Sequence, residues 1–222
     1  MKERWYHWAF LGIALLDLLV SYYCYRQTPI LGDIANIVLP TENYAAVLSD
    51  PLGWRVWTTS VVHVGPNRFF AHWFPYTYFN HVPLWLQAFF HPVESVYVAC
   101  GLVKLGTHLS ISWLLSYWIV GRASLRYLPF LRVFALISTL ILASPYGYFL
   151  PLRIVDQSVI YTFAYAFSFL FVLLYLHPFV CRYIGWTKGN LRWWEHMGCG
   201  LLSFVVVFHG PVNAPSIIIL AV

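Results

Sequence analysis

The chain has 222 residues, of which 60% are hydrophobic, 20% aromatic and only 9% charged, against roughly 25% charged residues in soluble domains. This composition excludes a soluble globular domain. The formal net charge of +5, spread over so apolar a chain, is typical of residues that orient a membrane protein and does not indicate nucleic-acid binding. We expect an all-α, polytopic membrane protein with about five to six transmembrane segments, built as a single transmembrane domain over residues 1–222.

Long apolar runs predict the membrane spans, because about 20 residues cross a hydrocarbon core. No small-residue cleavage site follows the first run, so it is expected to stay as an uncleaved span. The predicted spans are Trp5–Tyr25, Val93–Val120, Leu128–Phe149, Ser158–Cys181 and a fifth that begins near Met197 and is interrupted at residues 209–215.

A sixth apolar run, "SIIILAV", stops at Val222 after too few residues to cross a membrane. Half a span would leave backbone groups unpaired in lipid. We therefore expect the chain to be the N-terminal part of a longer protein. The alternative is a short re-entrant end held against a partner.

Basic residues in the short connections predict the orientation. If the first four spans each cross once, three basic clusters fall on one side, which is then cytoplasmic together with the N-terminus. The protein is expected in the plasma (inner) membrane, with a large external loop at residues 26–92 and a short external connection at residues 150–157. The clusters are Lys2 and Arg4, then Arg122 and Arg126, then Arg182, Lys188 and Arg192.

The predicted external loop is rich in aromatic residues and is expected to fold on the membrane surface. Residues 40–48 predict a short helix that Thr41 caps, and residues 79–92 predict an interfacial helix. Two of the loop's acidic residues have ordinary structural interpretations. Glu42 suits a helix start, and Asp50, before a proline, suits a turn.

Asp33 is the acidic residue that the loop structure explains least. It follows a glycine, stands seven residues after Arg26 and lies among isoleucines and a leucine, so we expect it at the membrane boundary. A carboxylate there would be partly desolvated, which suits binding a cation or activating a hydroxyl.

Other polar groups in the predicted external segments are candidate ligand contacts. Arg68, in "VGPNRFFAHWFPY", suits a phosphate, although it also suits snorkelling to lipid headgroups. Arg153 and Asp156 either pair with each other or line an external cleft. The broken end of the fifth span exposes backbone donors beside a cavity. The candidate substrate-binding residues are Asp50, Arg68, His72, Arg153, Asp156, His209 and Asn213.

Three ionisable residues lie deep in predicted spans, where an unpaired charge is expensive. Asp17 is expected to pair with Lys104, which shares a helix face with His108. A proton or ion pathway is the functional alternative.

An uncleaved first span, an aromatic external loop with an acidic residue soon after the membrane, and further short-looped spans together resemble the polytopic membrane glycosyltransferases of the type C fold. The resemblance implies transfer of a sugar from a polyprenyl-phosphate donor at the external face, with Asp33 as catalytic base and Asp156 as a second acidic site. It further implies that Arg68 or Arg153 holds the lipid phosphate. A divalent cation is the one cofactor that the resemblance suggests, although Asp33 lacks the acidic neighbour common in that family.

We therefore predict a membrane glycosyltransferase whose partners are a lipid-linked sugar donor, membrane lipids and other membrane subunits. The alternatives are half of a transporter or flippase, in which Asp17, Lys104 and His108 carry coupling ions, and a non-catalytic subunit of an envelope-polysaccharide assembly. Inverted internal repeats would favour the transporter, and the sequence shows none.

Overall fold

The computed structural model describes residues 2–28, 30, 33–59, 65, 67–142, 154–155, 158–210 and 213, and within them every regular element is helical, as predicted. α8, η1 and α9 follow one another without a break. The elements are α1 (Lys2–Gln27), α2 (Ile34–Val38), α3 (Glu42–Ser49), α4 (Arg55–Thr58), α5 (Phe69–Leu86), α6 (Pro92–Val120), α7 (Leu128–Leu142), α8 (Val159–Tyr161), η1 (Thr162–Phe167), α9 (Ser168–Tyr183) and α10 (Trp193–Val207).

Among the described residues, three helical stretches are long and apolar enough to cross a membrane, namely Arg4–Gln27, Pro92–Val120 and Val159–Tyr183. They confirm the predicted first, second and fourth spans as helices, and Leu128–Leu140 adds a shorter apolar helix. The chain is thus an α-helical membrane protein. Residues 143–149 of the predicted third span, and the sixth apolar run, lie outside the described residues.

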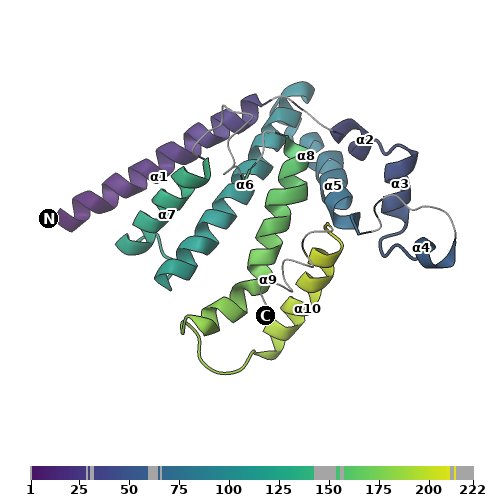
Figure 1. Cartoon of the computed structure of the whole chain (residues 1–222). Helices are drawn as coiled ribbons and strands as arrows, with labels where there is room; N and C mark the ends of the chain where they lie inside the picture. The colour runs from purple at the N-terminus through teal and green to yellow at the C-terminus, as the bar shows by residue number, and fades with distance from the viewer. Residues whose placement is uncertain are drawn as a thin grey trace.

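Contacts near the helix ends give the directions of the long helices. Arg26, near the end of α1, forms an ion pair with Glu94 at the start of α6, so these two helices are antiparallel. Near the other end of α6, the Trp118 Nε1–H donates to His177 Nδ1 in α9 at 2.8 Å. Helix α2 lies near the end where α1 stops and α6 starts, and α3, α4 and α5 lie beside it along one side of the bundle (Figure 1); we call this region the loop end.

Helix α5 corrects one prediction about the loop. It begins at Phe69 and ends at Leu86, where the sequence suggested an interfacial helix at residues 79–92. Its buried residues recur every four positions and face α6 and α2: Ala71, Pro75, Phe79 and Pro83. Helix α3 confirms the predicted short helix, but Thr41 occupies the N-cap position without a side-chain capping bond.

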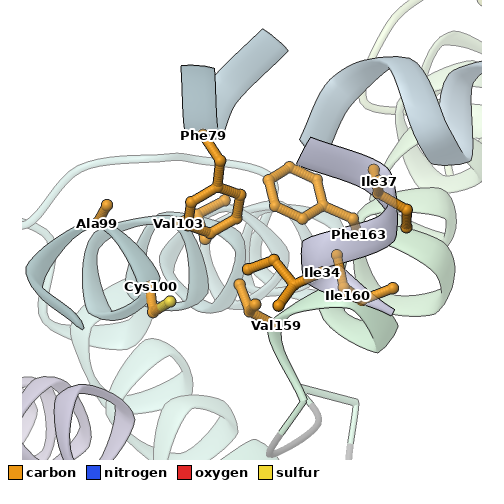
Figure 2. Packing of buried hydrophobic residues seen from close by; sticks show 9 residues of the cluster. All are labelled: Ile34, Ile37, Phe79, Ala99, Cys100, Val103, Val159, Ile160 and Phe163. Atoms are coloured by element: carbon orange, nitrogen blue, oxygen red, sulfur yellow. The ribbon is translucent and has the colours of Figure 1, made fainter. Parts of the chain in front are cut away.

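The loop elements are anchored in the interior of the bundle. Helices α2 and α5 contribute three residues to a buried cluster whose other members come from α6, α8 and η1 (Figure 2). Burial of apolar surface of this kind holds the loop elements on the bundle. The cluster comprises Ile34, Ile37, Phe79, Ala99, Cys100, Val103, Val159, Ile160 and Phe163.

The polar residues inside the spans pair differently from the prediction. Asp17 accepts a hydrogen bond from the Ser138 hydroxyl at 2.5 Å, and Ser138 Oγ lies 3.0 Å from His108 Nε2. The Lys104 ammonium donates to Thr28 Oγ1 at 2.7 Å. The expected Asp17–Lys104 pair is therefore wrong, and a hydroxyl from α7 takes the place of the cation.

Candidate functional site

A small cavity of about 250 Å³ lies at the loop end of the bundle. Five segments line it: the start of α2, α3, the start of α5, the α8–η1 region and the residues after α10. Four of the residues that the sequence singled out, Asp33, Arg68, His72 and His209, are among its walls. The full lining is Asp33, Ile37, Tyr44, Arg68, Ala71, His72, Ile160, Tyr161, Ala164, Tyr165, His209 and Gly210.

Asp33 stands immediately before α2 and lines the cavity with an exposed side chain. The carboxylate is therefore less desolvated than the sequence suggested. Its backbone is nevertheless fixed, because the next residue, Ile34, and Ile37 lie in the buried cluster. Burial, followed by the nearby Asp33 carboxylate, raises the pKa of Tyr44, which places a phenol beside that carboxylate.

Arg68 stands immediately before α5, and His72 lies one helical turn further along the chain. Arg68 holds the N-cap position with an exposed side chain, and its aliphatic part lies against Gly65, where an added Cβ would come within 3.2 Å of Arg68 Cδ. The His72 ring meets Tyr44 edge to face at 5.1 Å. Burial lowers the pKa of His72, and the charge of Arg68 adds to this effect while the Asp33 carboxylate opposes it.

His209 follows α10 and forms the most buried polar part of the cavity, with 1% of its surface exposed. Its Nε2–H donates to the carbonyl oxygen of Phe163 at 2.8 Å. Burial lowers the pKa of His209 to about 4, so the ring is neutral near pH 7. The Phe70 amide donates to the Phe208 carbonyl at 3.0 Å and ties this end of the chain to the start of α5.

The wall opposite α5 contains a segment of π-helix. Residues Thr162–Phe167 take this wider geometry, and Ala164 and Tyr165 of the segment line the cavity. Single turns of π-helix inside α-helices are frequent at functional sites. Here the segment also supplies the carbonyl, of Phe163, that orients His209.

The structure places the remaining site candidates elsewhere. Asp50 lies outside the cavity, and its carboxylate accepts from the backbone N–H groups of Trp54 at 3.0 Å and Arg55 at 2.9 Å. The Asn213 amide donates to the Val206 carbonyl at 3.3 Å, beside the cavity but not in its lining. Arg153 and Asp156 lie outside the described residues.

Three tyrosines in the cavity wall were not among the site residues predicted from the sequence: Tyr44, Tyr161 and Tyr165. The last two are four residues apart in "YTFAYAF", a spacing that places them on one face of a helix. With 16 tyrosines in the chain, that spacing alone did not distinguish them from residues at the membrane surface.

A second hollow, of about 570 Å³, lies where α1 meets α6 and is larger than the cavity. Its main charges, Arg26 and Glu94, pair with each other. The cavity is different, since the structure shows no ion pair between its two described charged residues, Asp33 and Arg68. A carboxylate and a guanidinium that do not pair with each other, beside neutral imidazoles, suit a ligand that carries both hydroxyl and phosphate groups.

Metal binding finds no support in the part of the chain that the structure describes, where no group of three or more histidine, cysteine or acidic side chains is arranged to hold an ion.

No protein-family model, curated protein or solved structure matches this chain. The chemistry of the cavity therefore has to be argued from its own residues.

Proposed function

We propose that the chain belongs to a membrane glycosyltransferase that moves a sugar from a lipid-phosphate donor to a hydroxyl acceptor at the external membrane face. The observation that carries the proposal is the cavity itself. Three distant parts of the sequence meet in one small space at the loop end, namely Asp33, Arg68 with His72, and His209. They combine a base, a phosphate-binding cation and hydrogen-bonding rings.

Asp33 acts as the base in the proposed reaction, and Arg68 stabilises the leaving group. The acceptor hydroxyl attacks the anomeric carbon of the donor sugar, and its proton passes to the Asp33 carboxylate. A new carbon–oxygen bond forms while the bond from the anomeric carbon to the phosphate oxygen breaks with inversion. The electron pair leaves with the lipid phosphate, and the Arg68 guanidinium stabilises the departing anion.

The position of the cavity supports a lipid-linked donor. A lipid phosphate lies at headgroup depth, so the groups that act on it must lie at the ends of the spans. The cavity is lined by Tyr161 and Tyr165, in the first two turns of the Val159–Tyr183 helix, beside the loop elements α2, α3 and α5. In the orientation that the basic clusters predict, with a cytoplasmic N-terminus in the plasma membrane, the loop end is external.

The size of the cavity limits what it holds. A volume of about 250 Å³ is below the roughly 300–1,000 Å³ of common ligand sites. It therefore suits the reacting sugar and phosphate, with the lipid chain outside. The exposed rings of Tyr161 and Tyr165, with 47% and 67% of their surface accessible, provide apolar area at the rim for the lipid or the acceptor.

The test is Asp33→Asn, with Glu42→Gln as a matched acid-to-amide control on an exposed residue outside the cavity. Transfer from radiolabelled polyprenyl-phosphate sugars is measured in membranes that contain the intact protein. We expect Asp33→Asn to reduce transfer by about 100- to 10,000-fold, the usual contribution of a general base. Glu42→Gln should behave as wild type, and both variants should insert normally.

The transporter alternative rests on one observation, the line of hydrogen-bonding groups formed by Asp17, Ser138 and His108 inside the bundle. If Asp33→Asn keeps transfer while Asp17→Asn or Lys104→Met abolishes it, the mechanism proposed for Asp33 is wrong. Retained transfer in the Asp17 and Lys104 variants supports a structural role for these residues.

A further inference from the structure

The two ring nitrogens of His209 have different hydrogen-bonding roles, one as donor and one as acceptor. The Phe163 carbonyl oxygen only accepts hydrogen bonds, so the His209 Nε2 atom, 2.8 Å away, must carry the proton. In a neutral imidazole the other nitrogen then bears a lone pair. His209 therefore presents Nδ1 as a pure acceptor.

This acceptor has no partner. Nδ1 of His209 is buried and makes no hydrogen bond to any described residue, and the same holds for Nδ1 of His72. Buried polar atoms without partners are rare in folded proteins, and each calls for an explanation. Because both rings line the same cavity, a ligand that enters it is the simplest source of the missing bonds.

His209 is also held rigidly. Its ring lies 5.7 Å from the rings of both Phe74 and Phe171, which come from different helices. The Phe163 carbonyl fixes its rotation, and the bond between Phe70 and Phe208 fixes its backbone. A fixed acceptor gives geometric selectivity, because the ligand must bring its donor to one place.

The chemical class of the ligand group follows from this polarity. A phosphate at neutral pH offers mainly acceptor oxygens, which a lone pair on Nδ1 repels, whereas a sugar hydroxyl offers a donor. Arg68 has the opposite polarity, since a guanidinium only donates, and it is exposed where His209 is buried. The two residues therefore select different parts of one molecule.

We propose that the inner end of the cavity recognises a neutral sugar hydroxyl through His209 Nδ1, so that the donor enters sugar first with its phosphate toward Arg68. This inference rests on the proposed function and adds the orientation of the donor to it. It makes His209 a specificity-determining residue. A site selective for the lipid phosphate alone would need cationic groups at this inner end.

The first experiment observes the ring directly in the intact protein in lipid nanodiscs. With ¹⁵N-labelled histidine, the His209 Nδ1 resonance, assigned by its absence in His209→Gln, should show an unprotonated nitrogen at neutral pH. Methyl glycosides of glucose, galactose, mannose and arabinose are then titrated to high concentration, with decyl phosphate as the comparison. We expect at least one glycoside, and not decyl phosphate, to shift the Nδ1 resonance saturably.

The second experiment measures affinity with monodeoxy derivatives of the glycoside that binds best. Loss of the hydroxyl that meets His209 should weaken binding to the wild type about three- to tenfold, as expected for one neutral hydrogen bond. In His209→Gln the amide can still reach the Phe163 carbonyl but leaves no acceptor at Nδ1, so this discrimination should vanish. His209→Asn, whose amide lies near the Nδ1 position, should retain part of it.

Three outcomes overturn the proposal: a protonated Nδ1, a resonance that responds to decyl phosphate or to no glycoside, and equal discrimination in wild type and His209→Gln. These measurements need no sugar transfer. A failure of Asp33 to act in transfer would leave them unaffected, and a failure here would leave transfer by Asp33 intact. The two proposals are therefore separately refutable.

Discussion

Replacing Asp50 by alanine removes an acceptor for the backbone N–H groups of Trp54 and Arg55, at 3.0 and 2.9 Å. Loss of a capping side chain costs about 0.5–2 kcal/mol, and hydrogen bonds to a charged group are worth about 1.5–3 kcal/mol each. Since only 7% of Asp50 is exposed, water replaces the lost bonds poorly. We expect a cost of about 2 kcal/mol for Asp50→Ala, and less for Asp50→Asn, which keeps one acceptor oxygen.

This cost should be local, because α4 has only four residues and none is buried. Opening of α4 exposes Arg55 to trypsin, so cleavage there should quicken about 30-fold in Asp50→Ala. Ser49→Ala is the control, since that hydroxyl bonds only to the Ala46 carbonyl in α3. Sugar transfer should be unchanged below the temperature at which the protein unfolds. Lost transfer with an uncleaved α4 would refute this reasoning and return Asp50 to the substrate site.

Three further results are expected. Arg68→Lys should weaken binding of decyl phosphate about tenfold by calorimetry, because lysine lacks the planar fork of guanidinium; equal affinity would remove phosphate binding from Arg68. Gly121→Ala should lower the thermal midpoint by several degrees, since Gly121 has φ +74° and an added Cβ would meet the Trp186 ring at 2.6 Å; an unchanged midpoint would contradict this close contact. Burial lowers the pKa of His209 from 6.5 to about 4, so the unfolded chain binds the proton first as the pH falls. Stability in urea should therefore decline by roughly 3 kcal/mol between about pH 6.5 and 4, and an equally steep decline in His209→Gln would contradict this cause.

The long spans were predictable because membrane burial imposes one simple requirement, a sustained apolar run. The start of α5 was not, since it carries Pro75, which indicates a break in a helix, whereas Pro83 lies inside the helix predicted at residues 79–92. In the structure both prolines lie on the buried face of α5. Packing of this face against α6 and α2 offsets the backbone hydrogen bonds that the prolines cannot make. Local propensity favoured a break, and tertiary contact overrode it.

The partners of polar residues were harder to predict than the residues themselves. Asp17 was recognised as a carboxylate deep in a predicted span, but its partner Ser138 is one of many small polar residues in apolar helices. A serine carries no charge that marks it in sequence. The same difficulty applies to the π-helix at Thr162–Phe167, whose residues differ in no obvious way from those of the α-helix that follows.

The relation between Asp33 and Arg68 shows how the fold sets the site. Both side chains are exposed and do not form an ion pair, so direct attraction between them does not fix their separation. Their backbones do. Asp33 precedes Ile34, which lies in the buried cluster, and Arg68 begins the helix that contributes Phe79 to the same cluster. The bundle core therefore positions a carboxylate and a guanidinium at one cavity without pairing them with each other, which is the arrangement that the proposed transfer reaction uses.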